Sequence, residues 1–350
     1  DALTLSETVG ASRAQRTGRR AAIHSGRVRW GTEELTHTLQ NDVGPVVATH
    51  RLHRGDLAVE VSLQGGGIQR FARGGQTLMC PAPTAPYLAC FAMLPFCSRI
   101  NTGRFQYGEH EVALAPNFPP EPHAIHGFGW QGLWQLDTQD EHGCVLVYEH
   151  DGAASDDTGW PWTFRASQRL TLSDSGLWVT LTLENLSNDV MPAGMGLHPH
   201  FPLAVDMRVS MACADRVVMT DGLLPTLEKL DDHGEVNPLA DRPWLRRGLD
   251  DVFAHRSGGV QIVWPDQPWS LSVEPDSMLP HWIVYAPRGG EFICIEPISH
   301  LPNAVNINPI KAPFDGAMKA LTPGQGWTTT TAFVTYAITQ STLQAPSTSC

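Results

Sequence analysis

The sequence predicts an all-β protein built as one large antiparallel sandwich. Short runs of alternating apolar and polar residues recur along the chain, and this alternation is typical of half-buried strands. No segment of the length of an ordinary helix carries a convincing amphipathic pattern. The 32 Gly and 27 Pro residues are spread along the chain, where they supply turns between strands rather than one linker.

The strand-like runs are rich in Val, Thr, Ile and aromatic residues, and Gly, Pro, Asn and Asp bound them. The clearest is LWVTLTLENL, whose Leu and Val residues up to Leu183 would face one side of a sheet while Trp, Thr and Glu face the other. The predicted strands, in chain order, are 57–63, 144–150, 177–186, 260–264, 269–275, 292–297 and 327–338.

No repeat or internal boundary divides residues 43–338, so we expect one domain there. A chain of 350 residues can bury a large core, and β-sandwiches of this size occur as single units. Residues 1–42 carry six arginines and few apolar clusters, which predicts a disordered tail; an organelle transit peptide is the alternative interpretation. The polar stretch 339–350 is predicted to be a second tail.

The charge balance argues against some partners. Nucleic acids and anionic membrane surfaces bind clustered Lys and Arg, whereas this chain has a formal net charge of −12. Its longest apolar stretch, residues 87–96, is too short to span a membrane and contains a proline. Seven cysteines without a CxxC pair give no disulfide framework, so we expect a reducing, cytoplasmic compartment.

Polar residues that are able to carry chemistry gather near turns and strand ends. His198 and His200 stand one residue apart in the apolar run MGLHPHFPL, so in an extended strand their side chains share a face. Glu296 follows directly on the apolar run FICI, which predicts a buried carboxylate. The other groups are Arg99 in PFCSRIN, His123 and His126 in HAIHGFGW, and the adjacent Asp250 and Asp251 in LDDVF.

These groups also have plainer interpretations. A histidine beside apolar residues is usually a hydrogen-bonded core residue, an arginine there is usually half of an ion pair, and a carboxylate at a strand end often satisfies a turn. Alternatively, H-x-H at 198–200 and H-x-x-H at 123–126, with a glutamate, would offer three or four ligands to a metal. Against a metal, H-x-H is common by chance, and here Pro199 separates its two histidines.

A histidine and a buried carboxylate also form an acid–base pair. Burial raises the pKa of a glutamate, and an unperturbed histidine has a pKa of about 6.5, so both can be poised near neutral pH. Such a pair can take a proton from one oxygen while it delivers another to a second oxygen, without a metal or cofactor. Opening and reclosing a sugar hemiacetal needs those two transfers, at the anomeric hydroxyl and at the ring oxygen.

Five motifs, in a fixed order, resemble those of the aldose 1-epimerases, or galactose mutarotases, over roughly residues 45–338. They are PFCSRIN, the His-Gly of HAIHGFGW, G-x-H-x-x-F in GLHPHF, the Asp of LDDVF, and Glu-Pro with P-N-A-x-N in EPISHLPNAVN. The resemblance implies a β-supersandwich, a large twisted antiparallel sandwich, and interconversion of the anomers of a free hexose without a cofactor. A small-molecule sugar is then the expected partner of a monomer or homodimer.

The resemblance also implies roles for individual residues. Glu296 matches the family's general base and His198 its general acid. Trp282, in the run WIV at 282–284, is expected to be a platform on which the sugar stacks. The positions that match substrate contacts are Arg99, His126 and Asp250, with Asp251 as the neighbouring alternative to Asp250.

Two departures from the family pattern bear on the substrate: His200 stands where Tyr is common, and Ser98 where Asn commonly precedes the arginine. Three alternatives remain beside a free-hexose mutarotase: a hexose 6-phosphate mutarotase, a sugar-binding module without catalysis, and a metal-dependent isomerase. A phosphate needs extra cations at the pocket. The candidates for that role are Arg70, Arg73 and Arg104. A binding module could lose the acid or the base, but this chain keeps both.

Overall fold

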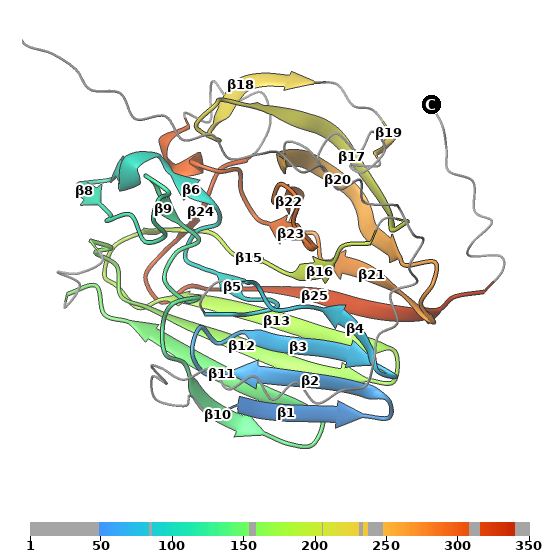
Figure 1. Ribbon diagram of the computed structural model, residues 1–350. Coiled ribbons are helices and arrows are strands. Elements are labelled where there is room, and N and C mark those ends of the chain that lie inside the picture. The colour runs from blue at the N-terminus through green and yellow to red at the C-terminus, as the bar shows by residue number, and fades with distance from the viewer. Residues whose placement is uncertain are drawn as a thin grey trace, which may run out of the picture. The chain divides into compact units, whose positions relative to one another are not determined.

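The computed structural model describes residues 49–339 except 84–85, 154–158, 205, 231–233, 237–247 and 308–315. All of these residues belong to one compact unit, Val46–Cys350, and the prediction of an all-β antiparallel fold is confirmed (Figure 1). The predicted tail at 1–42 lies outside the described residues, as does that at 339–350 except for its first residue.

One large antiparallel sheet forms the frame of this unit. Its main path crosses, in order, β10 (Gln135–Gln139), β11 (Gly143–His150), β12 (Phe164–Ser173), β13 (Gly176–Asn185), β25 (Gly326–Ala337), β21 (Trp269–Pro275), β20 (Leu249–Val263), β22 (His281–Ala286), β23 (Phe292–Ile298), β15 (Gly196–Leu197) and β5 (Ala92–Met93). Beside that path, β16 (His200–Pro202) pairs with β23, and β17 (Arg208–Met219) pairs with β20, β18 (Pro225–Leu230) and β19 (Gly234–Val236).

A four-stranded sheet covers one part of the large sheet, and its blue strands lie over the green β10–β13 in Figure 1. Buried side chains of both sheets, such as Val59, Phe71, Leu146 and Leu170, belong to one continuous hydrophobic cluster. The four strands are β1 (Thr49–Arg54), β2 (Leu57–Ser62), β3 (Ile68–Arg73) and β4 (Gln76–Met79).

Small elements close the ends of the sheets. The two-stranded pairs are β6 (Arg99–Ile100) with β9 (Ala124–Ile125), β7 (Arg104–Tyr107) with β8 (His110–Ala113), and β14 (Met191–Ala193) with β24 (Lys319–Leu321). Two single-turn 3₁₀ helices, η1 (Asn101–Gly103) and η2 (Ala304–Asn306), are the helical turns of the described residues. None of the described helices has the length and apolar character needed to cross a membrane.

All the strands predicted from alternation are present, and β13 shows why. From Leu177 to Asn185 its burial alternates residue by residue, so Leu181 and Leu183 lie in the core while Thr180 and Thr182 face outward. On that outer face, the hydroxyl pairs Thr180–Thr330 and Thr182–Thr328 lie 2.9 Å apart across β13 and β25. The pattern missed strands such as β6, β9 and β15, which are two residues long and too short to show a period, and it also missed long ones such as β12 and β17.

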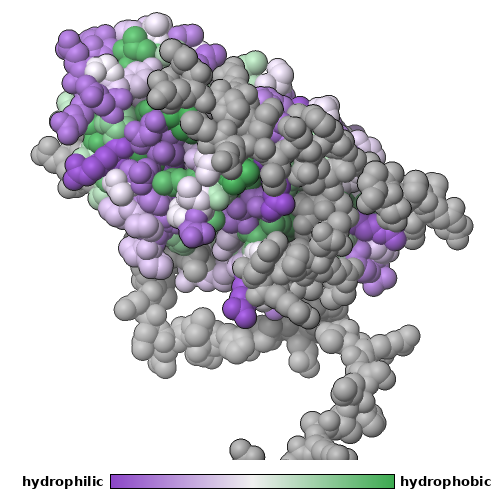
Figure 2. Space-filling model, turned by 90° about the horizontal axis from the view of Figure 1, so that it is seen from above, coloured by the Kyte–Doolittle hydropathy of each residue, from purple (hydrophilic) through white to green (hydrophobic). Residues whose placement is uncertain are grey.

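Some large apolar side chains of the described residues are exposed at the surface. Exposed examples include Leu133, Leu186 and Met278, which come from different parts of the chain. On the face shown in Figure 2, apolar residues in green lie among polar residues in purple. Scattered apolar residues of this kind are normal on soluble proteins and by themselves indicate no partner surface.

Leu181 offers a test of the shared core, because its side chain is 1% exposed. Replacing it with Ala should lower the free energy of unfolding by about 2–5 kcal/mol, from lost burial and the cavity left behind. Thr180→Ala, on the outer face of the same strand, should cost about 1 kcal/mol or less. Urea unfolding followed by circular dichroism measures both, and equal losses would contradict the assignment of the two faces.

Candidate active site

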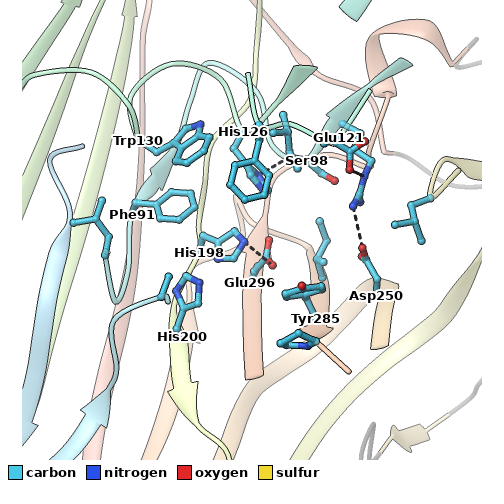
Figure 3. Close-up of a pocket in the computed structure, with 18 of the residues that line it drawn as sticks. Phe91, Ser98, Glu121, His126, Trp130, His198, His200, Asp250, Tyr285 and Glu296 are labelled. Carbon is cyan, nitrogen blue, oxygen red and sulfur yellow. Dashed lines mark hydrogen bonds and ion pairs between the residues drawn. The ribbon is translucent and has the colours of Figure 1, made fainter. Parts of the chain in front are cut away.

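A cavity of about 580 Å³ opens beside β20, β22 and β23, where the loops around β6, β9 and β16 meet these strands. Five of the six residues to which the resemblance assigns a role line it together, although they are far apart in the chain. They are Arg99 and four residues labelled in Figure 3, namely His126, His198, Asp250 and Glu296.

Strand register brings the carboxylates and the tyrosine of the pocket to one face of the sheet. Asp250 on β20 lies opposite Tyr285 on β22, and Ile283 on β22 lies opposite Glu296 on β23. Residues directly opposite each other in antiparallel strands point to the same side, and so do residues two apart in one strand. All four residues therefore line the cavity.

The same alternation corrects the assignment of Trp282. Its side chain is fully buried in the hydrophobic core, on the face of β22 opposite to that of Ile283 and Tyr285, and it is absent from the cavity lining. Trp282 therefore cannot offer its ring to a sugar in this pocket. The aromatic residues that line the cavity are Phe91, Phe118, Trp130, Tyr285 and Phe292.

Arg99 lies between two carboxylates at one end of the pocket. Its Nη2 donates to Asp250 at 3.1 Å, and its Nε donates to Glu121, also at 3.1 Å. The neighbouring Asp251 points to the other side of β20 and accepts from Arg216 at 2.7 Å. The structure thus places Asp250, and not Asp251, in the cavity. Glu121 was not anticipated, because no local pattern links it to an arginine in another loop.

Burial and charge oppose each other in this cluster. Burial disfavours the charge on Arg99, but Asp250 and Glu121 outweigh it and raise the pKa of the guanidinium. For Asp250, burial is the larger effect and raises the pKa of the carboxyl, while Arg99 lowers it. Two carboxylates against one guanidinium leave this end of the pocket without a spare positive charge.

The carboxylate of Glu296 and the imidazole of His198 meet in the pocket. Oε1 of Glu296 lies 3.3 Å from Nε2 of His198, and the two side chains are 2% and 11% exposed. Three rings crowd the imidazole: Phe91 at 4.6 Å, His200 at 4.8 Å and His126 at 4.9 Å between ring centroids. Figure 3 shows these rings around the contact of His198 with Glu296.

Burial shifts the pKa values of Glu296 and His198 in opposite directions. It raises the pKa of Glu296 well above its usual value, an effect that Asp250 increases and Arg99 opposes. It lowers the pKa of His198 well below its usual value, and His200 and His126 add to this shift. Both directions favour a protonated Glu296 beside a neutral His198. The pKa of His198 therefore differs from the unperturbed value on which the prediction from the sequence rested.

His126 is held in place by its own backbone and by Ser98. His126 and Gly127 both have positive φ, and a side chain at Gly127 would run into the carbonyl of Leu94. The amide of Ser98 donates to Nδ1 of His126 at 3.2 Å, so a neutral His126 carries its hydrogen on Nε2. Burial, with Arg99 and His200, lowers the pKa of His126 to about 3, which keeps it neutral.

The residues that could hold a metal in the structure differ from those that the sequence suggested. Among the described residues, His198, His200 and Cys294 place one ligand atom each within 4.8 Å of one another. Glu296 and His123 are not part of that group, and His123 does not line the cavity. Burial raises the pKa of Cys294 well above its usual value, so the thiol form is favoured in the absence of a metal.

The P-N-A-x-N motif has a structural function. The amide of Asn303 donates to the carbonyl of Arg99 at 2.6 Å, and Oδ1 of Asn303 accepts from the amide of Asn101 at 3.0 Å. Asn306 reaches the carbonyl of Arg104 at 2.9 Å. The loop after β23 is thereby tied to the segment that carries Arg99, so the motif links the position of Glu296 to that of the arginine.

The cations proposed for a phosphate lie elsewhere. Arg73 pairs with Asp56 at 3.1 Å, with its guanidinium 3.8 Å from the centre of the Trp269 ring. Arg70 on β3 and Arg104 on β7 are exposed, and none of the three lines the cavity. Among the described lining residues, Arg99 is therefore the one Arg or Lys, and it is already paired.

The fold is that of galactose mutarotase-like proteins. A family model described as aldose 1-epimerase matches residues 49–334, so the chain belongs to the aldose 1-epimerase family. The uncharacterized protein YphB of Escherichia coli K12 is 29% identical over 80% of this chain and 96% of its own. The uncharacterized protein YihR of the same organism is 26% identical over 74% of this chain and 86% of its own.

Solved structures agree with the fold. A crystal structure from Escherichia coli K12, of a protein named as a candidate aldose 1-epimerase, is 26% identical with a TM-score of 0.72. That similarity covers 83% of this chain and all of the other. A galactose mutarotase-like protein from Clostridium acetobutylicum is 18% identical with a TM-score of 0.69, over 82% of this chain and 95% of its own.

His300 provides a test of the buried neutral histidines. Nε2 accepts from the amide of Cys97 at 3.0 Å, and burial lowers the pKa of His300 to about 4 from a usual 6.5. Below about pH 6.5 the unfolded chain binds a proton here that the folded chain does not, so stability falls with pH until the folded pKa is reached.

Between about pH 7.5 and 5, the wild type should therefore lose about 2 kcal/mol more stability than His300→Gln. Urea unfolding of both proteins at each pH measures this difference. The comparison cancels the opposite pH effect of Glu296, which both proteins keep. Equal pH slopes for the two proteins would contradict the buried neutral state of His300.

Proposed function

We propose that this protein is an aldose 1-epimerase that interconverts the α and β anomers of a free, uncharged aldose. The observation that supports the proposal best is the contact of 3.3 Å between His198 and Glu296, buried in a pocket that also holds Arg99, His126 and Asp250. A pair at this separation can act on two oxygens attached to one carbon, and the anomeric carbon C1 carries such a pair, O1 and O5.

In the proposed reaction, Glu296 takes the proton of the O1 hydroxyl while His198 delivers a proton to O5. The C1–O5 bond breaks, and its electron pair stays on O5, so an open-chain aldehyde forms. Rotation about C1–C2 then presents the other face of the carbonyl. Both protons return by the same routes when the ring closes, and the other anomer is released.

The pKa directions favour one of the two stages of this cycle. The charged pair, Glu296 carboxylate with His198 imidazolium, holds as many protons as the neutral pair that burial favours. Ring opening converts the first pair into the second, so the neutral pair corresponds to the open-chain stage. The enzyme therefore needs no proton from solvent during turnover. The one requirement is that the bound sugar, while its ring is closed, stabilises the charged form of the Glu296–His198 pair.

The charges at the pocket favour an uncharged sugar over a 6-phosphate. A phosphate dianion needs unpaired cations. Arg99 is shared by Asp250 and Glu121, and the lining histidines with resolved pKa shifts are held neutral. The guanidinium and the carboxylate of Asp250 suit sugar hydroxyls instead, because one donates hydrogen bonds and the other accepts them.

Removing the base or the acid should abolish most of the activity. Glu296→Gln and His198→Asn should each slow the mutarotation of fresh α-D-galactose or α-D-glucose by about 10²–10⁴-fold, because each variant loses one proton transfer. Polarimetry follows the reaction directly. The matched controls are Glu111→Gln and His53→Asn, which change exposed residues outside the cavity and should keep the wild-type rate.

Three outcomes of these measurements, repeated with chelator and with a sugar-binding assay, would contradict the proposal. A rate within about threefold of wild type for either site variant would show that the residue is not an acid or base of the reaction. Activity that disappears on exhaustive chelation and returns with zinc would favour a metal held by His198, His200 and Cys294. Sugar binding without any mutarotation would favour a binding module.

Asp250 and Asp251 give a matched pair for substrate contacts. Asp250→Ala should weaken hexose binding by about ten- to a hundredfold, since a hydrogen bond to a charged group is worth about 1.5–3 kcal/mol. Asp251→Ala should do much less, because its carboxylate faces Arg216 on the other side of β20. Calorimetric titration of sugar into both variants decides between them, and a larger loss for Asp251→Ala would refute the assignment.

A further inference from the structure

An aromatic surface forms the end of the pocket away from Asp250. We call Phe91, Phe118 and Trp130 the aromatic wall. Phe91 stacks on Trp130 with 5.4 Å between ring centroids, and Phe118 meets Trp130 edge-on at 5.8 Å. All three line the cavity, and Figure 3 shows Phe91 and Trp130 on the side opposite to Asp250 and Glu121.

The aromatic wall adjoins the residue assigned as the acid. Phe91 packs against the ring of His198 at 4.6 Å, whereas Asp250 and Glu121, the partners of Arg99, lie beyond Glu296 as seen from the wall (Figure 3). The acid–base pair therefore has a direction within the pocket. His198 lies on the aromatic side, and Glu296 lies on the side of the charged cluster.

That direction fixes which edge of the sugar faces the wall. If O5 lies at His198 and O1 at Glu296, the C5 carbon bonded to O5 is on the aromatic side. The C2–C3 edge is then directed toward Asp250 and Arg99, which suits its hydroxyls. The substituent on C5, which in a hexose is the C6 hydroxymethyl group, meets the aromatic wall.

The wall offers this substituent apolar contact and no charge. The rings of Phe91 and Phe118 have no hydrogen-bonding group, and Nε1 of Trp130 is buried within the described structure. A C6 hydroxyl placed against these rings loses water without gaining a partner from them, and a charged group at C6 loses more. A methyl group at the same place is stabilised by leaving water.

We infer that the preferred substrates are aldoses with an apolar C5 substituent, namely 6-deoxyhexoses, ahead of hexoses and well ahead of 6-phosphates and uronic acids. This inference rests on the proposed mutarotase function and on the orientation of the sugar given above. It adds a substrate class, and it assigns the aromatic wall as the specificity-determining surface.

Matched sugars test the inference. 6-Deoxy-D-galactose and D-galactose differ only in the C6 hydroxyl, as do 6-deoxy-D-glucose and D-glucose. In at least one pair kcat/KM for the deoxy sugar should be about tenfold higher, the size of effect that an unpaired buried hydroxyl produces. D-Galactose 6-phosphate and D-galacturonate should be the poorest substrates. Ratios below about threefold in both pairs, or a preference for either anionic sugar, would overturn the inference.

A variant at the rim locates the effect. Phe118 is 39% exposed, so Phe118→Asn is compatible with folding, and it should reduce the deoxy preference by at least about threefold. Leu186→Asn, at a residue 46% exposed and outside the cavity, should leave the preference unchanged. An unchanged preference in Phe118→Asn would remove Phe118 from the specificity surface and overturn the assignment of the wall.

The test separates the inference from the function on which it rests. Mutarotation of galactose or glucose that depends on Glu296, without a preference for the deoxy sugars, would overturn the inference alone. No mutarotation of any of these sugars by the wild type would overturn both.

Discussion

The register between β22 and β23 is the constraint on which the site depends. Ile283 lies opposite Glu296, and one strand further Asp250 lies opposite Tyr285, so both carboxylates emerge on the same face. A slip of one residue between β22 and β23 would either turn Glu296 into the hydrophobic core or bring Trp282 or Val284 into the pocket. The buried apolar face of these strands, which includes Trp282 and Ile295, therefore maintains the position of the base.

Loops supply the remaining functional groups, and hydrogen bonds fix them to this frame. The amide of His198 donates to the carbonyl of Phe91 at 2.9 Å, and that of His200 donates to the carbonyl of Ala89 at 2.8 Å. Just before His126, the side chain of Asn117 makes two hydrogen bonds of 2.8 Å to Ile125: its Nδ2 donates to the carbonyl, and its Oδ1 accepts from the amide. Backbone contacts of this kind allow each histidine to be replaced without loss of the loop that carries it.

Much of the fold and part of the site could be predicted from the sequence. The alternation in β13 and β25 reports burial directly, because one face meets the core and the other meets water. The order of the motifs was enough to assign Glu296, His198 and Arg99 to one site, and the structure places all three in one pocket. The choice of Asp250 over Asp251 needed the strand ladder, since adjacent residues differ in face and not in chemistry.

Other features depend on contacts between distant segments. Glu121 and Asp250 are 129 positions apart (250 − 121), and Arg99 donates to both. The WIV run containing Trp282 gave no sign of which face points to the core, because both faces of β22 are largely buried. The aromatic wall joins residues on either side of β9 to Phe91, and no sequence period connects them.

The unequal charges around Arg99 also affect ligands before they touch the protein. Two carboxylates surround one guanidinium, and the whole chain carries a formal charge of −12. An anionic metabolite is therefore repelled during its approach, over a distance of about 8 Å at physiological ionic strength, whereas a neutral sugar is not. In a cell crowded with phosphorylated sugars, the uncharged ones would reach this pocket at an undiminished rate, and changes in salt would leave their encounter unaffected.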